Sequence, residues 1–270
     1  MNSSRKRIGM VGLGAIGRAV VQAVDEGRLP VEVAGVVSRD QAKASGFLQT
    51  LKSPPPLLEL PALLERADIV VEAAGGHVVP SLAEATFAAG KDLIVISIGA
   101  LLDHVELFEL ARAKGCRLIL PSGAIAGLDA VKGACMGQVD FVRLTSRKPP
   151  RALEGAPFLA ERGISLAGLE EERLLFTGPA RDAVKGFPDN LNVSAALSLA
   201  GIGPDRTEVN ITAVPGLTRN CHLIEVEGEF GRLEVRIENI PGENPKTGRL
   251  TALSILRAIQ DAVDTVRIGG

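Results

Sequence analysis

The first 120 residues alternate short apolar runs with segments of helical periodicity. This order is typical of an α/β domain, in which parallel strands are buried on both faces and joined by crossover helices. We expect strands at 8–11, 31–37, 68–73, 93–97 and 117–120, with helices at 15–26, 40–48, 78–89 and 104–114.

After Pro121 the pattern changes: one helix is expected at 127–136, and the later strands alternate polar with apolar residues. Such alternation predicts a mostly antiparallel, half-buried sheet, with a hairpin joining 223–227 to 233–240. The chain ends in a predicted amphipathic helix over 247–263, which we expect to return to the first domain. Its apolar stripe is Leu250, Leu253, Leu256, Ile259 and Val263.

Composition narrows the class of protein. The net charge is −2, there is no Trp or Tyr, and only 8 of 270 residues are Phe, so neither a nucleic-acid partner nor an anionic membrane is expected. The sequence contains no apolar run long enough for a membrane span and no secretory signal, which indicates a cytoplasmic protein. Cys116, Cys135 and Cys221 are odd in number and far apart, which favours reduced thiols, and no metal site is expected.

A glycine motif follows the first predicted strand and opens a predicted helix. Gly12, Gly14 and Gly17 have the spacing G-x-G-x-x-G, in which the glycines permit a tight turn, close approach of a pyrophosphate and close helix–strand packing. The helix N-terminus adds free N–H groups for the anion, so Ala15 and Ile16 join the candidate cofactor site. The alternative is a glycine-rich turn without a ligand. The motif predicts a Rossmann domain, a doubly wound parallel sheet that binds NAD or NADP.

The end of the second strand is where NAD-specific proteins place an acid for the ribose 2′-hydroxyl. Here Ser38 and Arg39 occupy that place and suit a 2′-phosphate, which favours use of NADP or of both cofactors. The alternative is that Arg39 is a solvated residue and Asp40 serves the ribose. Small residues at two further strand ends either let a flat cofactor lie close to the backbone or form tight turns; they are Ala73, Ala74, Gly75, Ser97 and Gly99.

Asn220 and His222 lie two residues apart on a predicted strand and therefore share one face. The pair could offer a small substrate one hydrogen-bonding group and one group that titrates near neutral pH. The alternative is a structural histidine that shares the face with Ile224 and Val226.

Several segments resemble the L-aspartate dehydrogenase family, and together they span nearly the whole chain. They are residues 11–17, 120–127, 145–150, 187–193, 219–222 and 244–247. The resemblance implies oxidation of L-aspartate by NAD or NADP to iminoaspartate, which either feeds nicotinamide-cofactor biosynthesis or hydrolyses to oxaloacetate and ammonia. It also implies that His222 is the catalytic acid/base, that Asn220 lies beside the substrate, that Ala124 and Asn190 contact the cofactor, and that the protein is a homodimer.

The two carboxylates of aspartate need cationic partners. Arg147, Lys148 and Arg219 are the candidates, although each could instead be a solvated loop charge. We expect the Rossmann domain to comprise residues 1–126 and 241–270, and the catalytic and dimerisation domain to be an α+β unit at 127–240. Two other hypotheses share this fold: another two-domain enzyme, similar to homoserine dehydrogenase or dihydrodipicolinate reductase, and a regulator that senses NAD(P) without turnover.

Overall fold

The computed structural model describes residues 5–188, 191–242 and 248–268. The chain divides into two compact units, one formed by Met1–Pro121 with Ala252–Arg267 and the other by Ser122–Thr251 with Ile268–Gly270. The second unit thus begins five residues earlier than the boundary expected from the sequence and includes Ala124. Each unit contains one five-stranded sheet.

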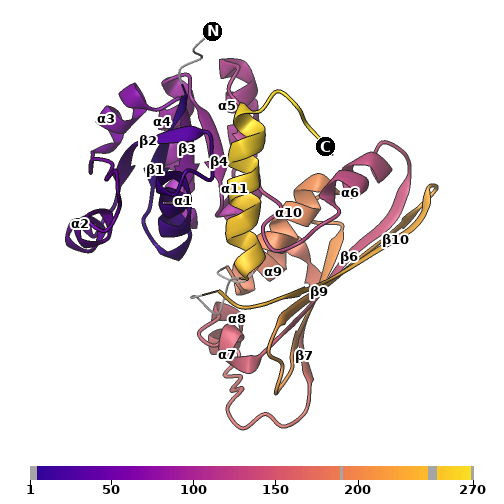
Figure 1. Cartoon of the computed structure of the whole chain (residues 1–270). Coiled ribbons are helices and arrows are strands. Elements are labelled where there is room, and N and C mark those ends of the chain that lie inside the picture. The colour runs from indigo at the N-terminus through magenta and orange to yellow at the C-terminus, as the bar shows by residue number, and fades with distance from the viewer. Residues whose placement is uncertain (1–4, 189–190, 243–247, 269–270) are drawn as a thin grey trace. The chain divides into compact units, whose positions relative to one another are not determined.

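The sheet of the first unit is wholly parallel (Figure 1). Its strands are β1 (Lys6–Val11), β2 (Val31–Val37), β3 (Ile69–Glu72), β4 (Asp92–Val95) and β5 (Leu118–Ile119), and they lie in the order β2-β1-β3-β4-β5. The crossovers reverse direction between β1 and β3, which is the point where open α/β sheets bind ligands. The five strands expected from the apolar runs are confirmed, with ends that differ from the expected bounds by at most two residues.

Helices cover both faces of this sheet, as a doubly wound fold requires. One face packs against α1 (Ala15–Asp25), α2 (Gln41–Leu48) and α11 (Arg249–Val263). The other packs against α3 (Leu60–Arg66), α4 (Val79–Ala88) and α5 (Glu106–Lys114), with two short turns at η1 (Gly76–Val78) and η2 (Ile98–Asp103). Helix α3 was missed in the sequence because it follows a proline-rich loop, although Pro61 lies in its first turn, where proline is tolerated.

The terminal helix α11 packs into the core of the first unit, beside the strands of the parallel sheet (Figure 1). Its buried residues are Ile255, Leu256 and Ile259. The expected stripe was partly wrong, because Leu253 is 51% exposed. Residues two apart in a helix differ by about 200° around its axis, so Leu253 lies on the side opposite to Ile255, which is buried in the core.

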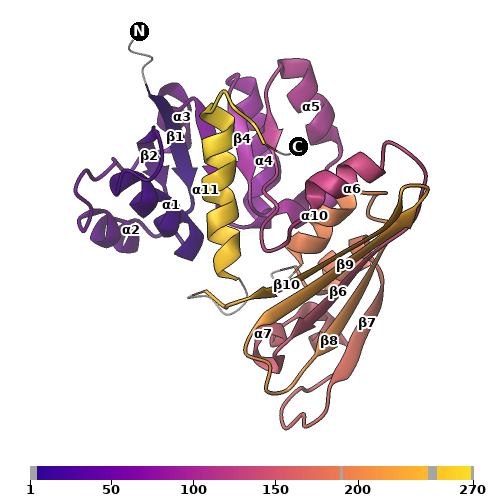
Figure 2. The ribbon, with the colours of Figure 1, turned by 45° about the vertical axis from the view of Figure 1, so that its right-hand side comes forward.

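The sheet of the second unit is mixed (Figure 2). Its strands are β6 (Val139–Lys148), β7 (Arg173–Pro179), β8 (Thr207–Ala213), β9 (Asn220–Gly228) and β10 (Gly231–Asn239), in the order β10-β9-β6-β8-β7. Only β6 and β8 run parallel; the other three pairings are antiparallel, which confirms the expected mostly antiparallel sheet. The expected hairpin is also present and joins β9 to β10.

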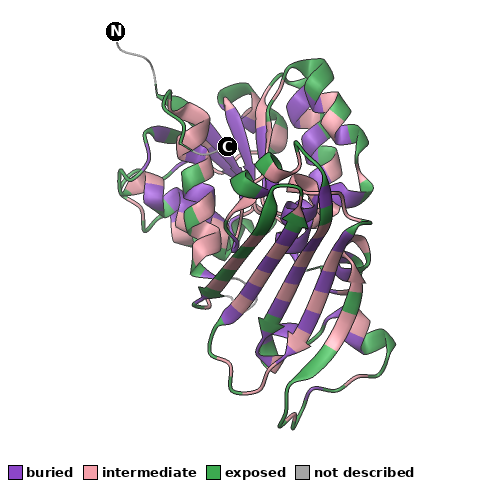
Figure 3. Cartoon of the chain, turned by 90° about the vertical axis from the view of Figure 1, so that its right-hand side faces the viewer, coloured by how far each residue is buried: buried purple, intermediate pink, exposed green. Residues whose placement is uncertain are grey.

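Buried and less buried residues alternate along these strands, as Figure 3 shows by its bands. The buried positions form what we call the covered face, since α9 (Ala180–Gly186) and α10 (Asn192–Ala200) pack on β7, β8 and β6 and carry buried apolar residues. The intermediate and exposed positions form the open face. The remaining helices of the unit are α6 (Leu128–Ala134), α7 (Pro150–Leu153) and α8 (Pro157–Glu161). Within the described ranges, no helix has the length and apolar character needed to cross a membrane.

Candidate functional site

The glycine loop after β1 has the shape that a dinucleotide requires. Gly12 has φ +94°, and a Cβ there would lie 2.4 Å from the carbonyl oxygen of Ala73, so a side chain is excluded. A Cβ on Gly17 would come within 2.2 Å of the Gly12 oxygen, which explains the close helix–strand packing. A Cβ on Gly14, in contrast, would meet nothing within 4 Å. The space at Gly14, before the N-terminus of α1 at Ala15 and Ile16, fits the approach of a pyrophosphate.

The end of β2 lies beside this loop, because the Gly12 amide donates to the Val37 carbonyl at 2.9 Å. Ser38 and Arg39 follow directly, half-buried and exposed respectively. The Asp40 carboxylate is already engaged, since it caps α2 by accepting from the Lys43 amide at 3.0 Å. This contact favours Ser38 and Arg39 over Asp40 as the groups that meet the cofactor's 2′ position.

The small residues expected to border a cofactor follow β3 and β4 in the parallel sheet. Ala73, Ala74 and Gly75 come directly after β3, and Gly75 has φ +110°. Ser97 follows β4, while Gly99 lies in the short turn η2. All are therefore at the carboxyl edge of the sheet, where the glycine loop also lies.

The buried histidine of the second unit has polar neighbours on the covered face. His222 is 3% exposed, and its Nδ1 lies 2.8 Å from the hydroxyl of Ser146, the residue opposite it on β6. Lys148, two residues along β6, and Asn220, two residues along β9, are each 2% exposed. We call these four residues the imidazole cluster. The two-residue period of a strand brings all four to one face, as expected for Asn220 and His222.

Burial controls the charges of the imidazole cluster. Desolvation, reinforced by the positive charge of Lys148, lowers the pKa of His222 to about 3, so the imidazole is neutral at physiological pH. Desolvation alone lowers the pKa of Lys148 from 10.5 to about 8. The cluster therefore combines a neutral imidazole with an ammonium group that remains mainly protonated near neutral pH.

Ala124 is tied to the same sheet by a side chain that the sequence did not single out. The Asn239 amide, 4% exposed at the end of β10, donates to the Ala124 carbonyl at 2.6 Å. Asn239 pairs with Asn220 in the β9–β10 register. The segment after Pro121 is thus fixed next to the strand that carries His222.

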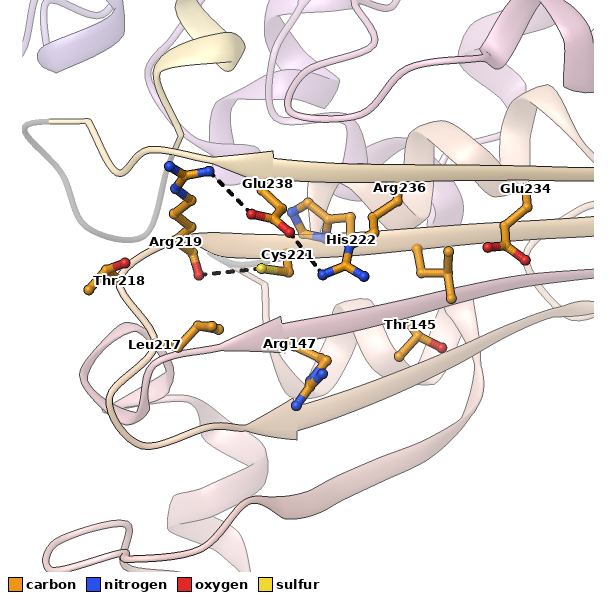
Figure 4. Close-up of a pocket in the computed structure, with 11 residues that line it drawn as sticks. Thr145, Arg147, Leu217, Thr218, Arg219, Cys221, His222, Glu234, Arg236 and Glu238 are labelled. Atoms are coloured by element: carbon orange, nitrogen blue, oxygen red, sulfur yellow. Dashed lines mark hydrogen bonds and ion pairs between the residues drawn. The ribbon is translucent and has the colours of Figure 1, made fainter.

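The two candidate arginines lie on the open face of the sheet, whereas the imidazole cluster lies on the covered face. Arg147 forms an ion pair with Glu172, and Arg219 with Glu238 at 3.2 Å. Both line a pocket of about 600 Å³, which His222 also borders and whose charged side chains are shown in Figure 4. Of the three candidate cations, only Lys148 shares the covered face with His222. The strand alternation on β6 separates it from Arg147, its neighbour in sequence.

Three residues that the sequence analysis did not single out also matter here: Ser146, Asn239 and Glu72. Ser146 and Lys148 are polar residues at inward positions of β6, and this departure from the apolar pattern of Val142 and Leu144 was the available signal. Asn190 lies outside the described residues. In the part of the chain that the structure describes, no group of three or more His, Cys, Asp and Glu side chains could hold a metal ion.

Two family models match successive parts of the chain, and the match to the later part extends into α11, which packs in the first unit. Residues 129–262 match the model described as aspartate dehydrogenase, C-terminal. Residues 12–121 match the NAD-binding domain of homoserine dehydrogenase.

Curated relatives cover almost the full length. The chain is 47% identical over 267 residues to L-aspartate dehydrogenase of Bradyrhizobium diazoefficiens, with 99% of this chain and 95% of the relative aligned. It is 45% identical to L-aspartate dehydrogenase 3 of Bordetella bronchiseptica over 99% of both chains.

Among solved structures, aspartate dehydrogenase of Thermotoga maritima superposes with a TM-score of 0.73 at 25% identity, covering 98% of this chain and 100% of that one. A homoserine dehydrogenase from Thiobacillus denitrificans, at 14% identity and a TM-score of 0.61, covers 98% of this chain and 76% of its own and supports the fold alone.

The burial of His222 predicts a specific loss of stability in acid. Between pH 6.5 and about 3 the unfolded imidazole binds a proton and the folded one does not, so stability falls as the pH falls through this window. The slope approaches about 1.4 kcal/mol per pH unit. Urea unfolding at several pH values should show that His222→Gln loses this component.

Ser146→Ala is the matched variant, since it removes the hydrogen bond and keeps the buried imidazole. It should retain the acid dependence of the native chain. An equal pH dependence in the native protein and in His222→Gln would mean that the folded imidazole titrates normally.

Proposed function

Because the chain belongs to the L-aspartate dehydrogenase family, we propose that it oxidises L-aspartate at Cα with NAD or NADP, and that His222 is the proton acceptor. The hydride goes to the nicotinamide and the amine loses a proton, which gives iminoaspartate; water then converts this imine to oxaloacetate and ammonia. The observation that carries the proposal is the imidazole held neutral by burial beside Ser146 and Lys148.

A neutral imidazole suits both proton steps of this reaction. Hydride leaves readily only from the free amine, so a base must first take a proton from the substrate ammonium or, later, from the water that attacks the imine. When His222 Nδ1–H donates to the Ser146 hydroxyl, Nε2 carries the lone pair that does this. Ser146 thus holds the ring in a fixed orientation on the covered face.

Lys148 supplies the charge that a dicarboxylate substrate needs in this part of the molecule. Its ammonium group is buried on the face that carries His222 and remains mainly protonated near neutral pH, so it can attract a substrate carboxylate. Asn220, also inward on β9, adds an amide that can donate to or accept from the substrate. Arg147 and Arg219, with glutamate partners on the open face, are less suited to this role.

The cofactor is proposed to lie along the carboxyl edge of the parallel sheet. The open space at Gly14 and the N-terminus of α1 suit its pyrophosphate. Ser38 and Arg39 suit a 2′-phosphate, so we expect NADP to be accepted as well as NAD. The small residues after β3 and β4 suit the flat nicotinamide end.

We further propose that the protein is a homodimer joined through the open face of the second sheet. This face alternates opposite charges, with Arg143 between Glu208 and Glu225 and Arg236 beside Glu238. A two-fold axis could pair such a surface with itself. The three cysteines are all free, which suits a reducing cytoplasmic compartment.

Replacing His222 by Asn should separate catalysis from cofactor binding. We expect the rate of aspartate oxidation to fall by about 10²- to 10⁴-fold, because the variant lacks the proton acceptor. The dissociation constant of the reduced cofactor, measured by calorimetry, should stay within about twofold of the native value, a margin of roughly 0.4 kcal/mol. Homoserine serves as the control substrate. Absence of turnover with aspartate in the native protein would refute the proposed function.

We expect the two residues after β2, Ser38 and Arg39, to determine the preference for NADP or NAD. Arg39→Ala should weaken NADPH binding by roughly ten- to hundredfold, as expected for loss of a charge-assisted bond to the 2′-phosphate, and should change NADH binding little. Ser38→Asp is the converse variant and should repel NADPH while retaining NADH. If both variants bind the two cofactors in the native ratio, these residues do not contact the 2′ position.

The oligomeric state can be read from light scattering coupled to size-exclusion chromatography. The native chain, of 28.2 kDa, should elute at twice that mass. Arg236→Glu creates three acidic side chains on one face of β10, at positions 234, 236 and 238. Their mutual repulsion across the interface should shift the mass toward that of one chain. Arg112→Glu breaks an exposed ion pair on α5 and serves as the matched control. A native monomer would contradict the dimer.

A further inference from the structure

A buried carboxylate lies at the carboxyl edge of the parallel sheet, outside the residues assigned so far. Glu72 is the last residue of β3 and is 0% exposed. Among the described residues it is the one acidic residue in the buried core of the chain. A carboxylate is costly to remove from water unless hydrogen bonds replace its hydration, so this position requires an explanation.

Five donors surround the Glu72 carboxylate. Oε1 accepts from the amides of Ala74 and Gly75, at 2.8 and 2.9 Å, and from the Ser97 hydroxyl at 3.0 Å. Oε2 accepts from the amides of Ile96 and Ser97, at 3.1 and 2.9 Å. None of these donors is charged. The carboxylate therefore joins the loop after β3 to the loop after β4.

The same two loops border the proposed cofactor site. Ala74 and Gly75 donate one pair of the bonds. The carbonyl of Ala73, the residue before them, lies so close to Gly12 that a Cβ on Gly12 would be 2.4 Å away. The backbone amide of Ala73 also donates to Val11 at 2.7 Å. The conformation that Glu72 imposes on the loop after β3 is thus passed directly to the glycine loop.

We propose that Glu72 is a positioning residue of the cofactor site, which fixes the loops after β3 and β4 against the glycine loop in the conformation that receives the dinucleotide. This inference rests on the proposed function, since it concerns the same cofactor. A carboxylate is suited to the role because both of its oxygens only accept hydrogen bonds. Together they can hold N–H and O–H donors from two loops. A glutamine would face one of the two loops with its own NH₂ group.

The test is direct calorimetric titration with NADH and NADPH, supported by the fluorescence of the reduced cofactor, which no Trp or Tyr in this chain overlaps. Glu72→Gln should raise the cofactor dissociation constant by roughly ten- to hundredfold, as expected when at least two bonds to a charged group are lost. At saturating cofactor, the KM for aspartate should change by less than about threefold, because the hydrogen bonds of Glu72 within the described residues go to the loops after β3 and β4 and to none of the proposed substrate residues.

Two graded variants distinguish geometry from charge. Glu72→Asp keeps the charge but is one methylene shorter and cannot reach both loops, so it should weaken cofactor binding nearly as much as Glu72→Gln. Ser97→Ala removes only the hydroxyl bond and should weaken binding by a smaller factor in the same direction. Glu109→Gln, on the exposed surface of α5, is the matched control and should bind as the native chain does.

The outcomes separate this inference from the function it rests on. Native affinity in a folded Glu72→Gln variant, or in Glu72→Asp, would overturn the positioning role. If Glu72→Gln does not fold, native affinity in Ser97→Ala overturns it and a weakened affinity supports it. Failure of the native chain to bind either dinucleotide would instead refute the proposed function.

Discussion

The proposed chemistry of this protein depends on the burial of one imidazole among polar neighbours. Two adjacent strands, β6 and β9, turn Ser146, Lys148, Asn220 and His222 to the same inward face that their apolar residues occupy. Desolvation and the nearby ammonium lower the pKa of His222 to about 3. A neutral imidazole can accept a proton and the neighbouring ammonium can attract a carboxylate, and the proposed oxidation of an acidic amino acid uses both groups.

At the carboxyl edge of the parallel sheet, where the cofactor is proposed to lie, the main feature is a backbone held in one conformation. Glycines at positions 12 and 17 remove side chains that would collide with neighbouring backbone, and the Glu72 carboxylate holds the next two loops by five hydrogen bonds. The conformation of these loops thus depends on backbone groups and one buried carboxylate more than on exposed side chains. In the proposed function, cofactor preference is therefore left to Ser38 and Arg39, whose side chains make none of these contacts.

Local signals in the sequence predicted most of the fold and part of the site. Apolar runs gave the parallel strands, the glycine spacing gave the dinucleotide loop, and the two-residue period placed Asn220 with His222. These signals could not decide which of Arg147, Lys148 and Arg219 shares a face with His222. That depends on which face of the second sheet the helices cover. Ser146, Asn239 and Glu72 act through partners 24 to 115 residues away, and only the tertiary register reveals those contacts.

The most direct test of this account is the protonation state of His222 itself. The chain has only three histidines, so nuclear magnetic resonance of ring-¹⁵N-labelled histidine can assign each signal by its loss in a His→Gln variant. The account predicts that the His222 signal remains that of a neutral ring as the pH is lowered from 8 through 5, on the basis of a pKa lowered to about 3. A His222 signal that titrates with a midpoint near the ordinary value of 6.5 would contradict it.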